Sequence, residues 1–218
     1  MNKLLSFIVF LSLFLSSAAY YEFFILSMQW PPAYCRAKSC VQNPSRFSIH
    51  GMWPANKTNP QPSKCFNNDQ AKTTLNRNMI SATASAELPT SWPNLVGDNF
   101  EFWEREWLEH GTCSYSTFNQ TQYFDQANTI WKGLQLFDIL QKDGISPSTT
   151  EYHKRADFEM AIGKAIGKQL GDKFRIEFHC SEKNPELLEI RLCRNHAGSD
   201  YTGCKMYGNC GSTFKWKP

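Results

Sequence analysis

One stretch of the chain, residues 102–113, reads FWEREWLEHGTC and predicts an amphipathic helix. Residues four apart share one face of a helix, so Trp103 is expected beside Trp107, and Glu106 beside His110. A carboxylate and an imidazole held next to two buried tryptophans favour an acid–base pair. The alternative is an ordinary core helix that carries one satisfied histidine.

The end of this helix and a second stretch add to the pattern. Gly111 is expected to end the helix, in the position where glycine is common. Residues 47–54, FSIHGMWP, alternate apolar and polar side chains at first and predict a strand that runs into a turn. His50 is expected where that strand ends, and Gly51 permits a close backbone approach.

Together the two stretches resemble the active-site signatures of the ribonuclease T2 family. Those signatures are F-[ST]-[IV]-H-G-[LM]-W-P and F-W-x-x-E-W-x-x-H-G-[ST]-C, and both occur here in the expected order. The resemblance extends from residues 23–32 to the late cysteines. It implies a secreted endoribonuclease that acts on single-stranded RNA without a metal or cofactor.

The resemblance also implies a mechanism. RNA carries its own nucleophile, the ribose 2′-hydroxyl, and two imidazoles suit the proton transfers because they titrate near neutral pH. By resemblance His110 is the general base, His50 is the general acid, and Glu106 orients and polarises the site. The expected products are a 2′,3′-cyclic phosphate and a 5′-hydroxyl.

The substrate-binding positions are assigned by the same resemblance. Gln29, at the end of a strand over residues 20–30 that Pro31 and Pro32 terminate, either caps backbone or contacts a nucleobase. Asn94, Val96 and Phe102 are implied to line the pocket for the base 3′ of the cleaved bond, although Val96 and Phe102 equally suit ordinary packing. The full candidate set is Gln29, Trp53, Asn94, Val96, Phe102 and Arg105.

Two residues of the helix depart from the common family pattern. Arg105 stands where many members have histidine, and it keeps a permanent cation that can bind phosphate. Glu109 stands where lysine is usual, which reverses the charge next to His110. Because they are four apart, Arg105 and Glu109 are expected to pair. The hypothesis is a working but slow enzyme.

The first residues predict a secretory signal peptide over 1–19, with a basic start, an apolar run over residues 4–15 and small residues before the cleavage point. The remaining residues, 20–218, are expected to form one domain, since about 200 residues can bury a sizeable core. Aromatic residues at 14% and a net charge of +3 favour a packed globule that tolerates an anionic substrate without demanding one. We expect a secreted monomer with no membrane segment after cleavage.

Eight cysteines in a secreted chain indicate disulfides, and eight allow 105 pairings. A zinc site is disfavoured because no Cys-x-x-Cys pair accompanies the histidines. The family layout implies the pairs Cys35–Cys40, Cys65–Cys113, Cys180–Cys210 and Cys193–Cys204. Asn56 and Asn119 begin glycosylation sequons, which predicts exposed surface at both.

The second half of the chain is expected to be scaffold. Helical spacing covers residues 123–140 and 157–170, and Gly144 is a stop. Residues 174–180 and 188–192 alternate and predict two paired, half-buried strands. His153, His179 and His196 are interpreted as surface residues. The predicted fold class is α+β, with an antiparallel sheet packed against several helices.

The biological role has several candidates. Arg105, the weakly basic charge and the sequon at Asn56 favour a stylar S-RNase of gametophytic self-incompatibility, which F-box proteins of a pollen ubiquitin ligase would recognise. Alternatives are an S-like ribonuclease for phosphate recovery or defence, or a secreted binding or storage protein with impaired catalysis, for which Glu109 is the best support. A carbohydrate-binding protein would need exposed tryptophans, whereas Trp103 and Trp107 have core spacing.

Overall fold

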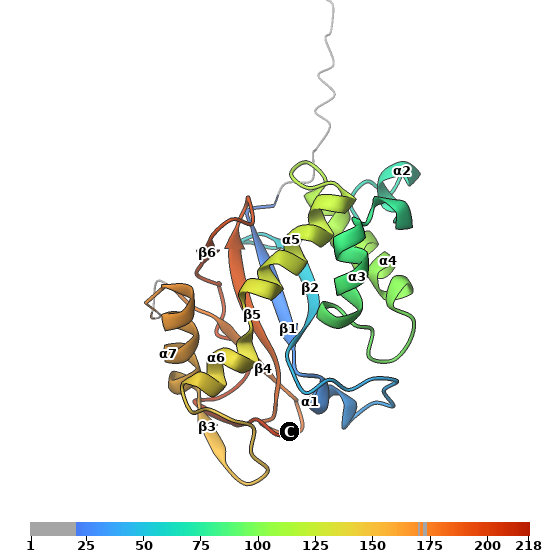
Figure 1. Cartoon of the computed structure of the whole chain (residues 1–218). Helices are drawn as coiled ribbons and strands as arrows, with labels where there is room; N and C mark the ends of the chain where they lie inside the picture. Colours follow the sequence, from blue (N-terminus) through green and yellow to red (C-terminus); the bar gives the residue numbers. More distant parts are fainter. Residues whose placement is uncertain (1–20, 170, 172–173) are drawn as a thin grey trace, which may run out of the picture.

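A computed structural model of the chain describes residues 21–169, 171 and 174–218 (Figure 1). The expected signal peptide and Leu170, the last residue of one predicted helix, lie outside the described residues. Within the described part, no helix combines the length and the apolar character needed to cross a membrane.

The centre of the fold is an antiparallel sheet with the strand order β2-β1-β5-β4, to which β6 adds by pairing with β5. Its strands are β1 (Phe23–Gln29), β2 (Ser48–Ala55), β4 (Glu177–Cys180), β5 (Leu187–Asn195) and β6 (Tyr201–Thr202). A second small sheet pairs β3 (Tyr152–Lys154) with β7 (Thr213–Lys215). The structure therefore confirms the predicted α+β class and the pairing of the two late strands.

Seven α-helices and two short 3₁₀ helices, η1 and η2, are found among the described residues. They are α1 (Pro31–Cys35), α2 (Gln70–Thr73), η1 (Arg77–Met79), α3 (Ala82–Ser91), α4 (Asn99–Glu109), η2 (Gly111–Ser114), α5 (Gln120–Gly133), α6 (Leu136–Lys142) and α7 (Arg155–Ile166). Figure 1 shows α3, α4 and α5 grouped beside β2, with α6, α7 and β3 towards the opposite end of the molecule. The helix predicted over residues 123–140 is in fact two helices, because the chain turns at Leu134 and Gln135.

The two faces of the sheet differ in what covers them. Phe24, Leu26 and Met28 of β1 are fully buried in the main core, which the helices share. Ile25, on the opposite face, belongs to a small cluster beside the Cys193–Cys204 disulfide. The sheet thus has one face covered by helices and a second face, which we call the open face, with far less cover.

The outer strand β2 is fastened to the helices by aromatic side chains. Indole N–H groups of Trp92 and Trp131 donate to the carbonyl oxygens of His50 and Phe47 at 2.8 and 3.0 Å, and the Tyr123 hydroxyl donates to that of Met52 at 2.7 Å. An edge strand exposes unpaired backbone groups, and these bonds satisfy three of them. They also fix the position of β2 relative to α3 and α5.

The four disulfides have the pairing that the family resemblance implied. Cys65–Cys113 joins η2, directly after α4, to the long segment that follows β2, across a separation of 48 residues. In the chain-entropy model a loop of that length stabilises the fold by about 4 kcal/mol. The bond therefore holds the end of α4 in place.

Several predicted boundaries are corrected. His50 is not at the end of its strand: β2 continues to Ala55, and the pairing with β1 skips His50 at a β-bulge. Pro54 does not break β2, because an outer strand needs no N–H donor on its free edge. Pro31 begins α1 as well as ending the segment before it, as proline often does at a first helical position. Of the three histidines predicted at the surface, His196 is exposed, whereas His153 and His179 are half-buried.

Candidate active site

His50 lies opposite a carboxylate that the sequence did not indicate. Its Nδ1 is 2.6 Å from Oε1 of Glu189 on β5, and an ionised carboxylate can only accept, so Nδ1 carries the proton in this bond. The other oxygen, Oε2, accepts from the Ser27 hydroxyl at 2.9 Å and from both Nε and Nη2 of Arg191 at 2.9 and 2.7 Å. Nε2 of His50 is thereby the nitrogen left for other partners.

This contact controls the protonation of His50. Burial alone would lower the pKa of the imidazole, but the hydrogen bond and charge of Glu189, helped by the charge of Glu106, reverse the effect and raise it. Burial of Glu189 is likewise outweighed by His50 and Arg191, which hold the pKa of its carboxyl well below the usual range. Both shifts favour the ion pair of imidazolium and carboxylate.

Glu106 comes from the middle of α4 and faces β2. Asp98 caps this helix by accepting from the N–H of Glu101 at 3.0 Å. Oε2 of Glu106 accepts from the indole of Trp53 at 2.9 Å, and only 8% of the residue is exposed. Burial raises the pKa of Glu106 to about 7, although His50 and the Trp53 hydrogen bond oppose the change. Both its protonated and ionised forms are accessible near neutral pH.

His110 is not paired with Glu106 in the way the helical spacing predicted. Its backbone leaves the helical region, with φ −126° and ψ −54°, so its ring turns towards Trp53, with ring centres 5.3 Å apart. Burial lowers the pKa of His110 to about 4; the charge of Glu109 opposes this shift and that of His50 adds to it. His110 is therefore a neutral imidazole at neutral pH.

Gly111 follows without the left-handed backbone expected of a helix-ending glycine, and it starts η2. The reason for glycine is contact: a Cβ there would lie 2.4 Å from Cε3 of Trp107. Trp103 and Trp107 are both buried, as their spacing predicted. Their indoles donate at 2.8 Å to the backbone oxygens of Trp92 and Lys72.

A hollow of about 110 Å³ adjoins His50. Five of the six residues expected to bind substrate line this hollow, and Trp53 does not. The five are Gln29, Asn94, Val96, Phe102 and Arg105. Tyr34 and Leu95, which the sequence did not single out, line it as well. Val96 is 45% exposed, which is too open for a core residue. The hollow is therefore accessible to a ligand.

Two of these side chains are already engaged with backbone. The Asn94 amide donates to the Asp98 oxygen at 2.8 Å and accepts from the Val96 N–H at 3.0 Å, so it shapes the loop before α4. The Gln29 amide lies 3.5 Å from the Ile49 oxygen, at the limit of a hydrogen bond. Gln29 is thus the less constrained of the two.

The expected pair between Arg105 and Glu109 does not form. Glu109 instead meets Lys64, with 3.0 Å between Nζ and Oε1, and accepts from the Ser63 hydroxyl at 3.3 Å. The Lys64 hydrogen bond lowers the pKa of Glu109. The Cys65–Cys113 disulfide explains the choice, because it brings residues 63–65 next to the end of α4. Arg105 remains exposed at the hollow, over the ring of Phe102.

Glu189 and Arg191 are the main site residues that sequence reasoning missed. They lie two apart on β5, and alternation indicated only that they share a solvent-facing side. Their partner His50 is 139 residues away from Glu189, so no local spacing could reveal the contact. Among the described residues, no group of three or more His, Cys, Asp or Glu side chains is placed to hold a metal ion.

This site joins a protonated imidazole, a neutral imidazole and a carboxyl group that titrates near 7, around the ring of Trp53. His50 can donate a proton and His110 can accept one, which is the arrangement that general acid–base catalysis needs. The cation of Arg105 stands beside the acid. A substrate with a negatively charged reacting group fits this combination.

Comparisons with known proteins identify the family and the fold. The model of the ribonuclease T2 family matches residues 21–204. Ribonuclease 1 of Arabidopsis thaliana is 31% identical over 92% of this chain and 88% of its own length. Ribonuclease S-1 of Pyrus pyrifolia is 30% identical over 91% and 87%. The crystal structure of RNase NT in complex with 5′-AMP superposes with a TM-score of 0.77 at 27% identity, covering 91% of this chain and 99% of that one.

A Glu189→Gln variant tests the control of His50. Without the carboxylate charge, burial should dominate and lower the pKa of His50 below its ordinary value. An NMR titration of the imidazole signals measures this directly. Glu177→Gln is the matched control, since Glu177 also pairs with a histidine on the open face, His179 at 3.0 Å, and should leave His50 unchanged. An unaltered His50 titration in Glu189→Gln would rule out the proposed control.

Proposed function

The chain belongs to the ribonuclease T2 family, and from that premise we propose that it cleaves single-stranded RNA internally by metal-independent transphosphorylation. The 2′-hydroxyl of the ribose attacks the adjacent phosphorus, the bond from phosphorus to the 5′-oxygen breaks, and a 2′,3′-cyclic phosphate and a 5′-hydroxyl result. No cofactor takes part in these steps.

The observation that carries this proposal is the placement of two imidazoles against the ring of Trp53, of which, among the described residues, only His50 is hydrogen-bonded to a carboxylate, Glu189. His110, neutral because its pKa is lowered to about 4, accepts the proton of the 2′-hydroxyl. His50, held protonated by Glu189, gives its Nε2 proton to the leaving 5′-oxygen. General acid–base steps of this kind each contribute about 10² to 10⁴ in rate.

Glu106 and Arg105 supply the remaining chemistry. Protonated Glu106 can donate a hydrogen bond to a phosphate oxygen, and its raised pKa of about 7 keeps that form populated. Arg105 places a permanent cation next to His50. The hollow beside them takes the base 3′ of the cleaved bond, with Gln29 and Phe102 in contact and Asn94 and Val96 shaping the wall. Trp53, between the two imidazoles, packs against the reacting nucleotide.

Cleavage of single-stranded RNA in the presence of EDTA tests the reaction. The wild type should yield cyclic phosphate ends, and His110→Ala should lose about 10² to 10⁴ in kcat/KM. DNA should not be cleaved, because it lacks the 2′-hydroxyl. His153→Gln, which removes an imidazole on β3 outside the site, is the control and should retain activity. Cleavage of DNA, or full activity of His110→Ala, would contradict the mechanism.

Glu109 makes this enzyme slow in our proposal. It places a carboxylate next to His110, at a position where, by the family resemblance, lysine is usual. Its ion pair with Lys64 also engages that lysine, which is then not free to contact a phosphate. A missing electrostatic contact to the transition state costs on the order of a hundredfold in rate.

Glu109→Lys should therefore raise kcat, by up to about a hundredfold, when assayed on the same RNA. Glu109→Gln removes the negative charge without adding a cation and should give a smaller gain. The residue is exposed enough that neither change should prevent folding. If Glu109→Lys brings no gain in turnover, the explanation for slow catalysis is wrong.

We further propose that residues 1–19 direct secretion and that cleavage leaves a single, soluble, monomeric domain from residue 20 onward. The predicted disulfides, all present in the structure, suit an oxidising compartment. Asn119 is exposed at the start of α5 and is the better candidate for a glycan. Asn56 is only half-exposed, contrary to the prediction from its sequon.

For the biological role we propose a stylar S-RNase, recognised in pollen by F-box proteins of a ubiquitin ligase. Arg105 and the likeness to Ribonuclease S-1 support it. The similar identity to Ribonuclease 1 supports the alternative of a general S-like enzyme equally well. If the wild type cleaves no RNA, the remaining hypothesis is a binding protein with impaired catalysis.

The distribution of the protein separates the two ribonuclease roles. A self-incompatibility protein should be abundant in styles and nearly absent from leaves and roots, measured by quantitative mass spectrometry of each tissue. Induction in leaves under phosphate starvation, with no enrichment in styles, would instead establish the S-like role.

A further inference from the structure

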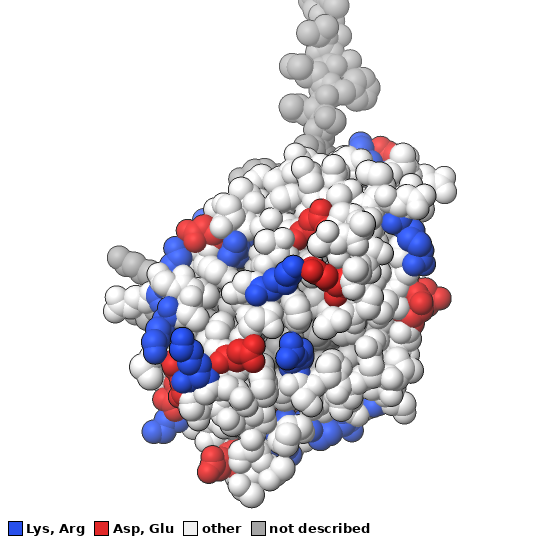
Figure 2. Space-filling model, viewed as in Figure 1, with Lys and Arg blue, Asp and Glu red and all other residues white. Residues whose placement is uncertain are grey.

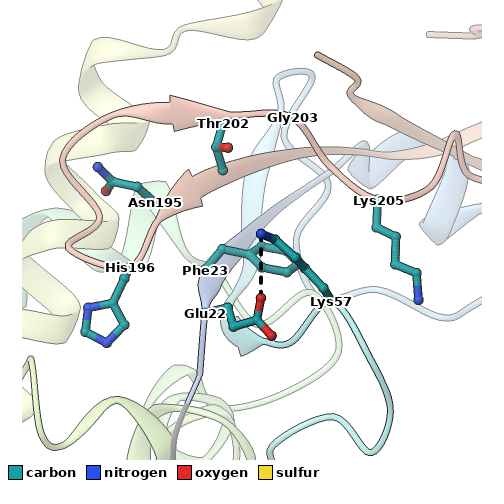
Figure 3. Close-up of a pocket in the computed structure, with 8 residues that line it drawn as sticks. All are labelled: Glu22, Phe23, Lys57, Asn195, His196, Thr202, Gly203 and Lys205. Carbon is teal, nitrogen blue, oxygen red and sulfur yellow. Dashed lines mark ion pairs between the residues drawn. The ribbon is translucent and has the colours of Figure 1, made fainter. Parts of the chain in front are cut away.

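Two neighbouring hollows lie on the open face of the sheet, beside the active site. The nearer one, which we call the corridor, has a volume of about 570 Å³ and is lined by residues that include Ile25, Glu177 and Arg191. The second, the far pocket of Figure 3, has a volume of about 400 Å³ and is lined by Glu22, Lys57, Asn195 and Thr202 among others. Phe23 and Lys205 line both, so the two hollows adjoin each other.

The strand register shows that this path starts at the catalytic centre. Ser27 of β1 stands between Gly51 and Arg191, directly beside His50 and Glu189. Ile25 comes next, opposite Trp53, and then Phe23, opposite Asn195 of the far pocket. Four residues of a strand span about 13 Å. Moreover, Arg191 of the corridor lies over the Trp53 ring, 4.9 Å from its centre. The path is therefore longer than one nucleotide and leads away from Trp53.

The charges on this path favour a polyanion. Glu177 is held by His179 at 3.0 Å, and Glu189, beside the path, is held by Arg191. Lys205 is exposed and forms no ion pair with any residue that the structure describes. Lys57 reaches across the far pocket to Glu22, but at 3.8 Å and with 78% of its side chain exposed (Figure 3). An exposed pair of this kind is worth about 0 to 1 kcal/mol, so Lys57 can turn to a phosphate at little cost.

The attraction must come from this local placement. On the face covered by helices, Figure 2 shows lysine and arginine interspersed with aspartate and glutamate, without a field of one sign. The whole chain carries only +3. Neither feature would draw RNA over a long distance, whereas two lysines beside two adjoining hollows provide discrete phosphate contacts.

We propose that the corridor and the far pocket bind the part of the RNA strand upstream of the cleaved bond, with Lys205 and Lys57 on its phosphates. The inference rests on the proposed function, because the hollow beside His50 takes the 3′ base and leaves the Trp53 side for the 5′ portion. The enzyme then binds RNA beyond the two nucleotides that flank the bond. Its efficiency rises when a substrate is extended on the 5′ side.

Binding of non-cleavable 2′-O-methyl oligonucleotides tests this without depending on catalysis. A dinucleotide core is extended by equal lengths on its 5′ or its 3′ side, and fluorescence anisotropy gives Kd at several salt concentrations. The wild type should bind the 5′-extended form more tightly than the 3′-extended one. In single strands each phosphate contact contributes about 0.7 to the salt slope, so Lys57→Gln/Lys205→Gln should reduce the slope by about 1.4.

That slope means that, between 50 and 200 mM salt, the wild type loses about sevenfold more affinity for the 5′-extended oligonucleotide than the double variant does. The matched control is Lys142→Gln/Lys164→Gln. Like the test variant, this control removes one lysine that has an ion-pair partner, since Lys164 lies 3.1 Å from Asp143. It also removes one exposed lysine, Lys142, that has no ion-pair partner among the described residues. The two lysines lie on α7 and α6. The control changes the net charge equally and should leave the slope as in the wild type.

Cleavage assays separate this inference from the proposed function. The double variant should cleave a dinucleotide as the wild type does and lose only the advantage of the 5′ extension. Equal slopes for the double variant and wild type, or equal weakening by the control, would overturn the inference while RNA cleavage still stood. A wild type that cleaves no RNA would refute the proposed function. The anisotropy data would then show on their own whether the two hollows bind the 5′ part of an RNA strand.

Discussion

The missing side chain at Gly51 is the constraint on which the geometry of the site depends. A Cβ at this position would lie 2.0 Å from Nε1 of Trp53 and 2.4 Å from Oε2 of Glu106, far inside any tolerable contact. Any larger residue would displace the Trp53 indole or push α4 away from β2. Either change would break the hydrogen bond between the Trp53 indole and the Glu106 carboxyl group. That bond is the link between the sheet, which carries His50, and the helix, whose end carries His110. Close packing at one glycine thus sets the relation between His50 and His110.

Differences in surroundings then give two identical side chains opposite roles. His50 sits at a bulge, where its ring can reach Glu189 on β5 even though β1 lies between the two strands. The small Ser27 side chain on β1 leaves room for that contact and donates to the same carboxylate. His110 has no comparable anion, so burial controls its pKa. A protein distinguishes an acid from a base in this way without changing the residue type.

The sequence predicted what is local or rests on the signature motifs, and missed what long-range pairing creates. Trp103 and Trp107 follow from helical spacing, and His50 and Glu106 from the motifs. No hydrogen bond or ion pair joins the Glu106 and His110 side chains among the described residues, although the His110 N–H still donates to the Glu106 backbone oxygen at 3.0 Å; both side chains contact Trp53 instead. Glu109 pairs with Lys64 and not with Arg105 because a disulfide brings a distant segment closer than the next helical turn. Glu189 was invisible, since strand alternation describes which face a residue occupies but not what it meets there.

The distribution of cations around the site has a consequence for how a weakly basic chain engages RNA. Lys64 is committed to Glu109, and Arg191 is committed to Glu189, so neither is fully available to phosphate. The cations that remain exposed near the path of the strand are Arg105 on one side of His50 and Lys205 with Lys57 on the other. In the proposed binding mode, contacts on both sides of the scissile bond hold the strand across His50 and His110, and they orient the 2′-hydroxyl better than one strong contact would. In that mode affinity is spread along the strand, and the two histidines act on whichever phosphate it brings between them.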